Sequence, residues 1–179
     1  MLFAPAGAGQ TQLDAPNGLL LVAKPGLADP NFRETVVLVT QTPDSSTVGV
    51  ILNRPTEMKH AKTGAPLFFG GPVMREVMVA LYRSERPPEA AAFHVLKGIY
   101  LTMHPQNMEQ LLGAAKERAA RSYRLFMGFA GWAPGQLESE LARDDWFVLP
   151  ARAELVFRKD TSGMWEELVR KVRRRVAMR

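Results

Sequence analysis

Residues 35–52 spell TVVLVTQTPDSSTVGVIL, two aliphatic runs on either side of a segment rich in Thr, Ser, Asp and Pro. Short β-branched runs that are closed by such residues are typical of buried strands. A connection of this length and composition is typical of an antiparallel hairpin. The segment therefore predicts two neighbouring strands that are buried inside a β-sheet.

Further strands are expected on both sides of this hairpin, because similar apolar runs recur along the chain. Helices come later. One begins at Pro105 and has an apolar stripe that continues to Ala119, and the next covers residues 135–144 with Leu137 and Leu141 facing inward. Because the strands come first and do not alternate with helices, the pattern predicts a single α+β domain with a mixed sheet. The other expected strands are residues 19–23, 67–69, 77–82, 93–96, 99–103 and 123–129.

The composition is that of an ordinary globular domain of 179 residues, with 46% apolar and 23% charged residues. The chain has no cysteine, which excludes disulfides, thiolate catalysis, cysteine-bound zinc and iron–sulfur clusters. No apolar run approaches the roughly 20 residues of a membrane helix, so we expect no membrane partner. Residues 1–12 are small and glycine-rich without a signal-peptide pattern, and they predict a mobile lead-in to the domain.

The basic residues are concentrated at the C-terminus. The formal net charge is +5, and the last ten residues hold six basic groups and no acid, so the rest of the chain has 17 basic and 18 acidic residues. An apolar stripe from Trp165 to Val176 predicts that residues 166–179 form a basic amphipathic helix packed on the domain, with Ser162 as the N-cap. The alternative is a nucleic-acid interface. Its candidate residues are Arg170, Lys171, Arg173, Arg174 and Arg175.

Three segments place Gly, Pro and polar residues at the ends of apolar strands, where sites are often built: LNRP (52–55), FFGGPV (68–73) and FMGFAGWAPGQLESEL (126–141). The paired glycines permit close approach to the backbone, and the helix of the third segment exposes free N–H groups. We expect the segments to form a polar pocket for a small polar ligand or a protein partner. The alternative is that a glutamate saturates Arg54 and the cluster is architectural. The candidate ligand-binding residues are Asn53, Arg54, Gly70, Gly71, Trp132, Gln136 and Glu138.

Five motifs in a fixed order carry a family resemblance. LLVAKPGLADPNF, TVVLV, GVILNRP, FGGPV and GFAGWAPGQLESEL resemble the AlgH family, also called the YqgE family, over residues 13–165. The resemblance implies a compact domain in which a small barrel-like sheet is flanked by helices, and a bacterial cytoplasmic protein without an established activity. Some members carry the label of transcriptional regulator. The chain departs from the family at Thr40-Gln41, where relatives commonly have Glu-His, at residues 103–107, and in its longer arginine tail.

Catalytic motifs are missing from the sequence. HxxxH, HExxH, GxSxG and a phosphate loop are all absent, and none of the three histidines, His60, His94 and His104, lies in a metal-binding pattern. We therefore predict no catalytic residue, no metal and no cofactor, in a regulatory protein that binds a ligand or a partner. The alternatives are a nucleic-acid-associated protein and a hydrolase.

Overall fold

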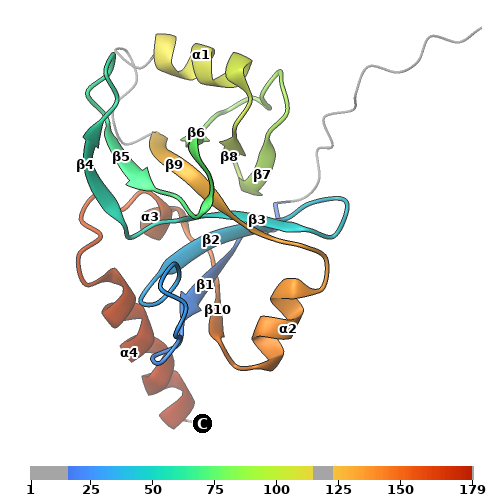
Figure 1. The fold of residues 1–179 in the computed structure, drawn as a ribbon. Coiled ribbons are helices and arrows are strands. Elements are labelled where there is room, and N and C mark those ends of the chain that lie inside the picture. The colour runs from blue at the N-terminus through green and yellow to red at the C-terminus, as the bar shows by residue number, and fades with distance from the viewer. Residues whose placement is uncertain (1–15, 115–122, 179) are drawn as a thin grey trace, which may run out of the picture.

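The computed structural model describes residues 16–114 and 123–178, which form one ten-stranded sheet and four helices (Figure 1). The strands are β1 (Leu19–Ala23), β2 (Val36–Gln41), β3 (Thr47–Ile51), β4 (Pro55–Lys59), β5 (Pro66–Phe69), β6 (Val73–Arg83), β7 (Phe93–Leu96), β8 (Ile99–Thr102), β9 (Tyr123–Trp132) and β10 (Trp146–Pro150). The helices are α1 (Pro105–Gly113), α2 (Gln136–Ala142), α3 (Ala153–Val156) and α4 (Met164–Ala177).

Strand β9 is the centre of the sheet because it pairs with three other strands. Its first half lies between β5, which runs parallel to it, and β6, which runs antiparallel. Its last residues pair with β3 instead. The strand order is β10-β1-β2-β3-β9-β6-β8-β7, with β4 paired to β5. The predicted α+β domain with a mixed sheet flanked by helices is confirmed, and the sheet is open rather than a closed barrel.

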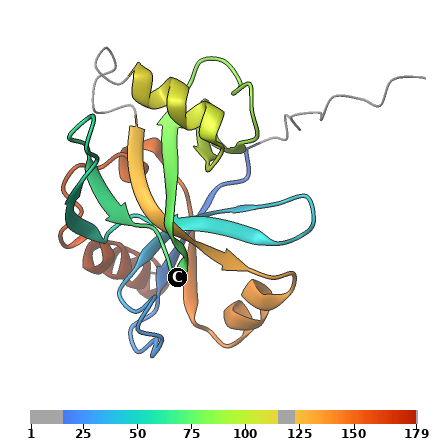
Figure 2. The same cartoon turned by 45° about the horizontal axis from the view of Figure 1, so that its top comes forward.

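Strands β2 and β3 are the expected hairpin, paired from Val37 opposite Ile51 to Gln41 opposite Thr47. Continuous aliphatic runs suit these strands because both faces of the sheet are covered. Leu38 and Val50 enter one core cluster, which α3 and α4 cover, and Val37 and Ile51 enter a second. Helix α2 and the loop after β1 pack against the second cluster (Figure 2). The sheet thus has an apolar layer on each face.

The first two helices begin as predicted. Pro105 lies in the first turn of α1, and the ring Nδ1 of His104 accepts a hydrogen bond from the backbone N of Gln106 at 3.2 Å, which caps the helix. Helix α1 ends at Gly113, and the later positions of the expected stripe, Ala115 and Ala119, lie outside the described residues. In α2, Leu137 and Leu141 are partly buried against the second core cluster.

Three elements were not predicted, and one cap is corrected. Strand β4, with the sequence PTEMK, is mostly exposed and has no apolar pattern that would predict it. Strand β10 and helix α3 are short and lie among charged residues, which hides them in the sequence. The N-cap of α4 is Gly163, in a left-handed conformation with φ 66°, and not Ser162. The Ser162 hydroxyl donates instead to Asp160 Oδ1 at 2.6 Å, which closes a turn before the helix.

Helix α4 packs on the sheet through the first part of its predicted stripe. Leu168 and Val169 are buried, and Trp165 Nε1 donates to the carbonyl of Ala23 in β1 at 2.7 Å. Val176 is 69% exposed, because the end of the helix extends past the sheet (Figure 1). No helix in the described ranges is both long and apolar enough to span a membrane.

Candidate functional site

The Asn53-Arg54 strand end holds the loop of residues 29–34, called here the 29–34 loop. Asn53 Nδ2 donates to the carbonyl of Glu34 at 2.9 Å, and its Oδ1 accepts from Val36 N at 2.8 Å. The Arg54 guanidinium donates to the carbonyls of Asn31 at 2.5 Å, Arg33 at 3.1 Å and Pro30 at 3.3 Å. Burial lowers the pKa of Arg54, and the charge of Arg33 lowers it further. The hydrogen-bond partners of Arg54 are therefore backbone carbonyls, and not the glutamate of the alternative prediction.

The double glycine allows two backbones to cross. Gly70 N donates to the carbonyl of Met127 at 2.9 Å, and the Gly70 carbonyl accepts from Ile51 N at 2.9 Å. A Cβ added at Gly70 would lie 2.2 Å from the Gly128 carbonyl oxygen, and one at Gly71 would lie 2.3 Å from Phe129. The connection between β5 and β6 therefore contacts β9 at a distance that only glycine permits.

Trp132 belongs to an aromatic cluster around the 29–34 loop. Its ring centroid lies 5.6 Å from that of Phe32 and 6.3 Å from that of Trp146, and Phe32 lies 5.8 Å from Trp146. One oxygen of Glu140 accepts both indole N–H groups at 2.9 Å, and the other accepts from Gln136 Nε2 at 3.3 Å. Trp132 is only 3% exposed, so it is a packed side chain.

The predicted segments therefore do meet in space, and the protein's own 29–34 loop lies at the centre of this region. Asn53 and Arg54 hold the loop backbone, while Phe32 of the same loop packs on Trp132. Sequence reasoning missed Phe32, because its contact with Trp132 joins segments far apart in the sequence. It also missed the role of Glu140, because the carboxylate reaches both indoles only when α2 folds beside the two strands that carry them. That these residues bind a ligand stays a prediction.

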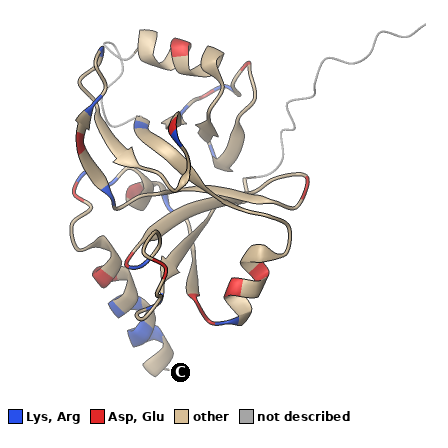
Figure 3. Ribbon diagram, viewed as in Figure 1, with Lys and Arg blue, Asp and Glu red and all other residues tan. Residues whose placement is uncertain are grey.

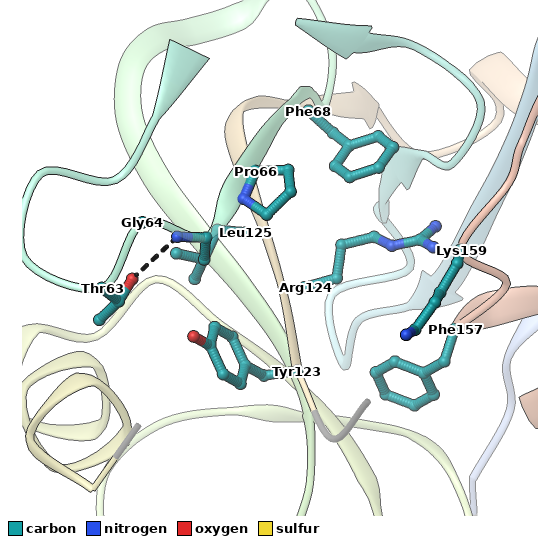
Figure 4. A pocket seen from close by; sticks show the side chains of 10 residues that line it. Thr63, Gly64, Pro66, Phe68, Tyr123, Arg124, Leu125, Phe157 and Lys159 are labelled. Atoms are coloured by element: carbon teal, nitrogen blue, oxygen red, sulfur yellow. Dashed lines mark hydrogen bonds between the residues drawn. The ribbon is translucent and has the colours of Figure 1, made fainter. Parts of the chain in front are cut away.

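A hollow of about 460 Å³ lies where three other segments meet, and we call it the Arg124 pocket (Figure 4). The β4–β5 connection, the start of β9 and the segment after α3 form its walls. Its volume lies within the range of small-molecule sites. The lining residues are Thr63, Gly64, Ala65, Pro66, Phe68, Tyr123, Arg124, Leu125, Phe157 and Lys159.

Arg124 is the buried cation of this pocket, with only 7% of the residue exposed. Its guanidinium donates to the carbonyls of Leu52, at 3.4 Å, and Arg158, and it lies 4.6 Å from the ring centroid of Phe68. Burial lowers the pKa of Arg124 to about 10, so the group stays charged at neutral pH. None of the ion pairs among the described residues involves Arg124.

Lys159 is a second cation in the lining of the pocket, and two arginines lie beside its wall residues. Lys159 is exposed on its wall, and the Arg83 guanidinium lies 4.9 Å from the ring centroid of Phe157. The Arg158 side chain is paired to Glu167 in α4 at 2.6 Å. The pocket therefore combines positive charge with aromatic walls. The sequence carried one overlooked signal, an arginine inside the otherwise apolar strand 123–129.

The pocket rim also holds a hydroxyl beside an imidazole. His60 Nδ1 and Thr63 Oγ1 are 3.0 Å apart, but the Gly64 backbone N also donates to the His60 carbonyl, as in an ordinary turn. A nucleophile needs a base that a third group orients, and the hydrogen bonds of the described residues give His60 no carboxylate. The described residues also contain no group of three or more His, Cys, Asp or Glu that could hold a metal ion.

The basic C-terminal residues lie on the exposed end of α4 (Figure 3). A shallow groove of about 400 Å³ runs along one side of the helix. It is lined by Glu167, Arg170, Lys171, Arg174, Arg175 and Met178. Residues separated by three or four positions share a helix face, so these four cations form one stripe. Arg173 is not among the residues that line the groove.

The fold and the pocket define an α+β domain built on one open mixed sheet, with a basic hollow where three segments meet. The chain belongs to the AlgH-like family, whose model matches residues 20–177. It is 36% identical over 169 residues to a UPF0301 protein of Thermobifida fusca, which covers 86% of this chain and 85% of the relative. A UPF0301 protein of Chlorobaculum tepidum is 33% identical over 160 residues, with 86% and 84% coverage.

Two solved structures have the same fold. A crystal structure of a Corynebacterium diphtheriae protein has a TM-score of 0.68 at 25% identity and covers 88% of this chain and 87% of its own. The solution structure of the AlgH protein from Pseudomonas aeruginosa has a TM-score of 0.69 at 21% identity, with 86% and 87% coverage. The second likeness concerns the fold alone.

Proposed function

We propose that this AlgH-like protein binds a small anion in the Arg124 pocket without catalysing a reaction. The observation that carries the proposal is a buried guanidinium on the wall of a cavity, without an ion-pair partner among the described residues. A buried charge is costly unless it is paired, so a cavity beside it favours an anionic occupant. The second cation that lines the pocket, Lys159, also favours a negatively charged ligand.

A regulatory role in the bacterial cytoplasm is part of this proposal. It is supported by the family resemblance, in which some members carry the label of transcriptional regulator. In this role, occupancy of the pocket changes what the protein binds. The segment that carries Phe157 and Lys159 leads directly into α4, so a ligand there contacts the stretch of chain before the basic helix.

The pocket is tested by a thermal-shift screen of metabolites against wild type and Lys159→Ala. Lys159 is exposed, so its loss leaves the fold intact, and an anion that it contacts should bind about twofold to fivefold more weakly. Lys97→Ala is the matched control, since Lys97 is an exposed lysine in the turn between β7 and β8. Affinities for each hit are then measured by calorimetry.

The same screen separates this pocket from the site that the sequence predicts. Gln136→Ala removes an exposed member of the predicted set, which comprises Asn53, Arg54, Gly70, Gly71, Trp132, Gln136 and Glu138. Hits that bind more weakly to Gln136→Ala but not to Lys159→Ala would place the ligand site at α2. Hits that are indifferent to both variants would contradict a ligand site in either place.

Nucleic-acid binding through α4 is a second candidate function, because the four-cation stripe lies on the exposed end of the helix. Each phosphate neutralised on duplex DNA contributes about −0.9 to the slope of log affinity against log salt. Arg170→Ala combined with Arg174→Ala should therefore make the slope about 2 less steep. Arg86→Ala combined with Lys97→Ala is the control with the same charge change at exposed positions. A slope that both double variants share would contradict this candidate.

A further inference from the structure

The Arg124 pocket has two chemically different parts. One part is cationic, with the Arg124 guanidinium and the exposed Lys159. The other part is apolar, with the rings of Phe68, Phe157 and Pro66 around the hollow (Figure 4). A ligand that satisfies both parts needs a charged group at one end and an apolar body.

The guanidinium determines the kind of charged group. A guanidinium has five N–H donors, and the carbonyls of Leu52 and Arg158 take one each from Nη1 and Nη2. Part of the donor fork therefore has no acceptor among the described residues. Such a fork matches the paired oxygens of a carboxylate or a phosphate, which it binds through two parallel hydrogen bonds. The charged group of the ligand is accordingly an oxyanion.

The volume and the walls of the pocket determine the apolar part of the ligand. The pocket holds about 460 Å³, which is in the range of sites for organic small molecules, so it has room for a body attached to the oxyanion. Phe157 and Phe68 offer ring faces, and each also lies against a guanidinium, that of Arg83 and that of Arg124 respectively. Flat apolar surfaces of this kind pack best against another ring.

From these contacts we infer that the ligand of the Arg124 pocket is an aromatic oxyanion, a carboxylate or phosphate joined directly to a ring. The oxyanion lies at Arg124 and Lys159, and the ring packs between Phe157 and Pro66. This inference rests on the proposed function, since it names the class of ligand for the same pocket.

Calorimetry with five simple probes tests the inference on the full-length chain. Benzoate and phenyl phosphate carry both features, acetate and inorganic phosphate carry only the oxyanion, and benzyl alcohol carries only the ring. We expect benzoate or phenyl phosphate to bind at least about tenfold more tightly than the other three, because only they use both parts of the pocket. The better of the two identifies the oxyanion.

Three variants place the probe in the pocket. Arg124→Lys keeps the charge and loses the forked set of donors. It should therefore bind the aromatic oxyanion about tenfold more weakly, and the affinities of the five probes should differ less than in wild type. Phe157→Leu keeps apolar volume and removes a ring, so it should weaken benzoate and not acetate. Lys159→Ala changes an exposed residue and covers the case in which Arg124→Lys does not fold.

Each adverse outcome overturns a stated part. If benzyl alcohol binds as tightly as benzoate, the ligand does not need an oxyanion. If inorganic phosphate binds as tightly as phenyl phosphate, the ligand does not need a ring. No binding of any probe would overturn the inference as a whole. The proposed function fails separately, when anionic hits of the metabolite screen show the same affinity for wild type and Lys159→Ala.

Discussion

Gly128→Ala is expected to destabilise the protein by about 3 kcal/mol or more, a large part of the roughly 5–15 kcal/mol that keeps a domain folded. Gly128 has φ +70°, and a Cβ there would lie 2.5 Å from the Gly71 carbonyl oxygen and 3.0 Å from that of Val73. Both atoms belong to the backbone, so no side chain can rotate away. Relief requires β6 or its lead-in to separate from β9, the strand that joins the two halves of the sheet.

Gly113→Ala is the matched control for this prediction. Gly113 is the last residue of α1, and a Cβ there would meet no atom within 4 Å. Alanine lowers the entropy of the unfolded chain and favours the helix, so this variant should be as stable as wild type or about 0.5–1 kcal/mol more stable. Urea unfolding followed by circular dichroism measures both variants. A Gly128→Ala midpoint close to that of wild type would contradict the packing described for the double glycine.

Glu140→Ala is expected to lower the free energy of unfolding by about 2–3 kcal/mol. The substitution leaves the indole N–H groups of Trp132 and Trp146 without their acceptor, and these residues are only 3% and 4% exposed. Buried donors that lose a partner carry the full desolvation cost. Water should enter to solvate them, so the tryptophan emission of the folded state should also shift to longer wavelength.

Glu138→Ala is the control for Glu140, because it removes the same charge two positions earlier on α2 from an exposed side chain. Its unfolding free energy should stay within about 0.5 kcal/mol of wild type, and its emission should not change. Equal losses in the two variants would mean that the helix charge matters and the shared carboxylate does not. The comparison also separates a predicted ligand-binding residue, Glu138, from one that the structure assigns to packing.

The candidate site was only partly predictable from sequence. The positions of Asn53, Arg54, Gly70 and Gly71 at strand ends follow from local Pro and Gly signals, and their convergence on one region is observed. What occupies that region did not follow, since Phe32 reaches Trp132 across the fold. Arg124 was overlooked because an arginine in a strand ordinarily points to solvent, and only its neighbours bury it.

The sequence by itself determined the parts of this protein that depend on a few neighbouring residues. The hairpin of β2 and β3, the α+β class and the start of α1 at Pro105 all follow from local apolar runs, turn residues and backbone sterics, which act between residues close together in the sequence. The basic end of α4 also follows from the order of the residues.

Only the tertiary structure decided the open sheet, the filling of the 29–34 loop and the Arg124 pocket. The pocket walls come from three segments that are far apart in the sequence, with the lining residues 63–66, 68, 123–125, 157 and 159. Their side chains become neighbours only after β5 and β9 pair and the segment after α3 packs beside them. A cavity and the burial of a charge are properties of such packing, because they depend on which distant atoms exclude water from the same space.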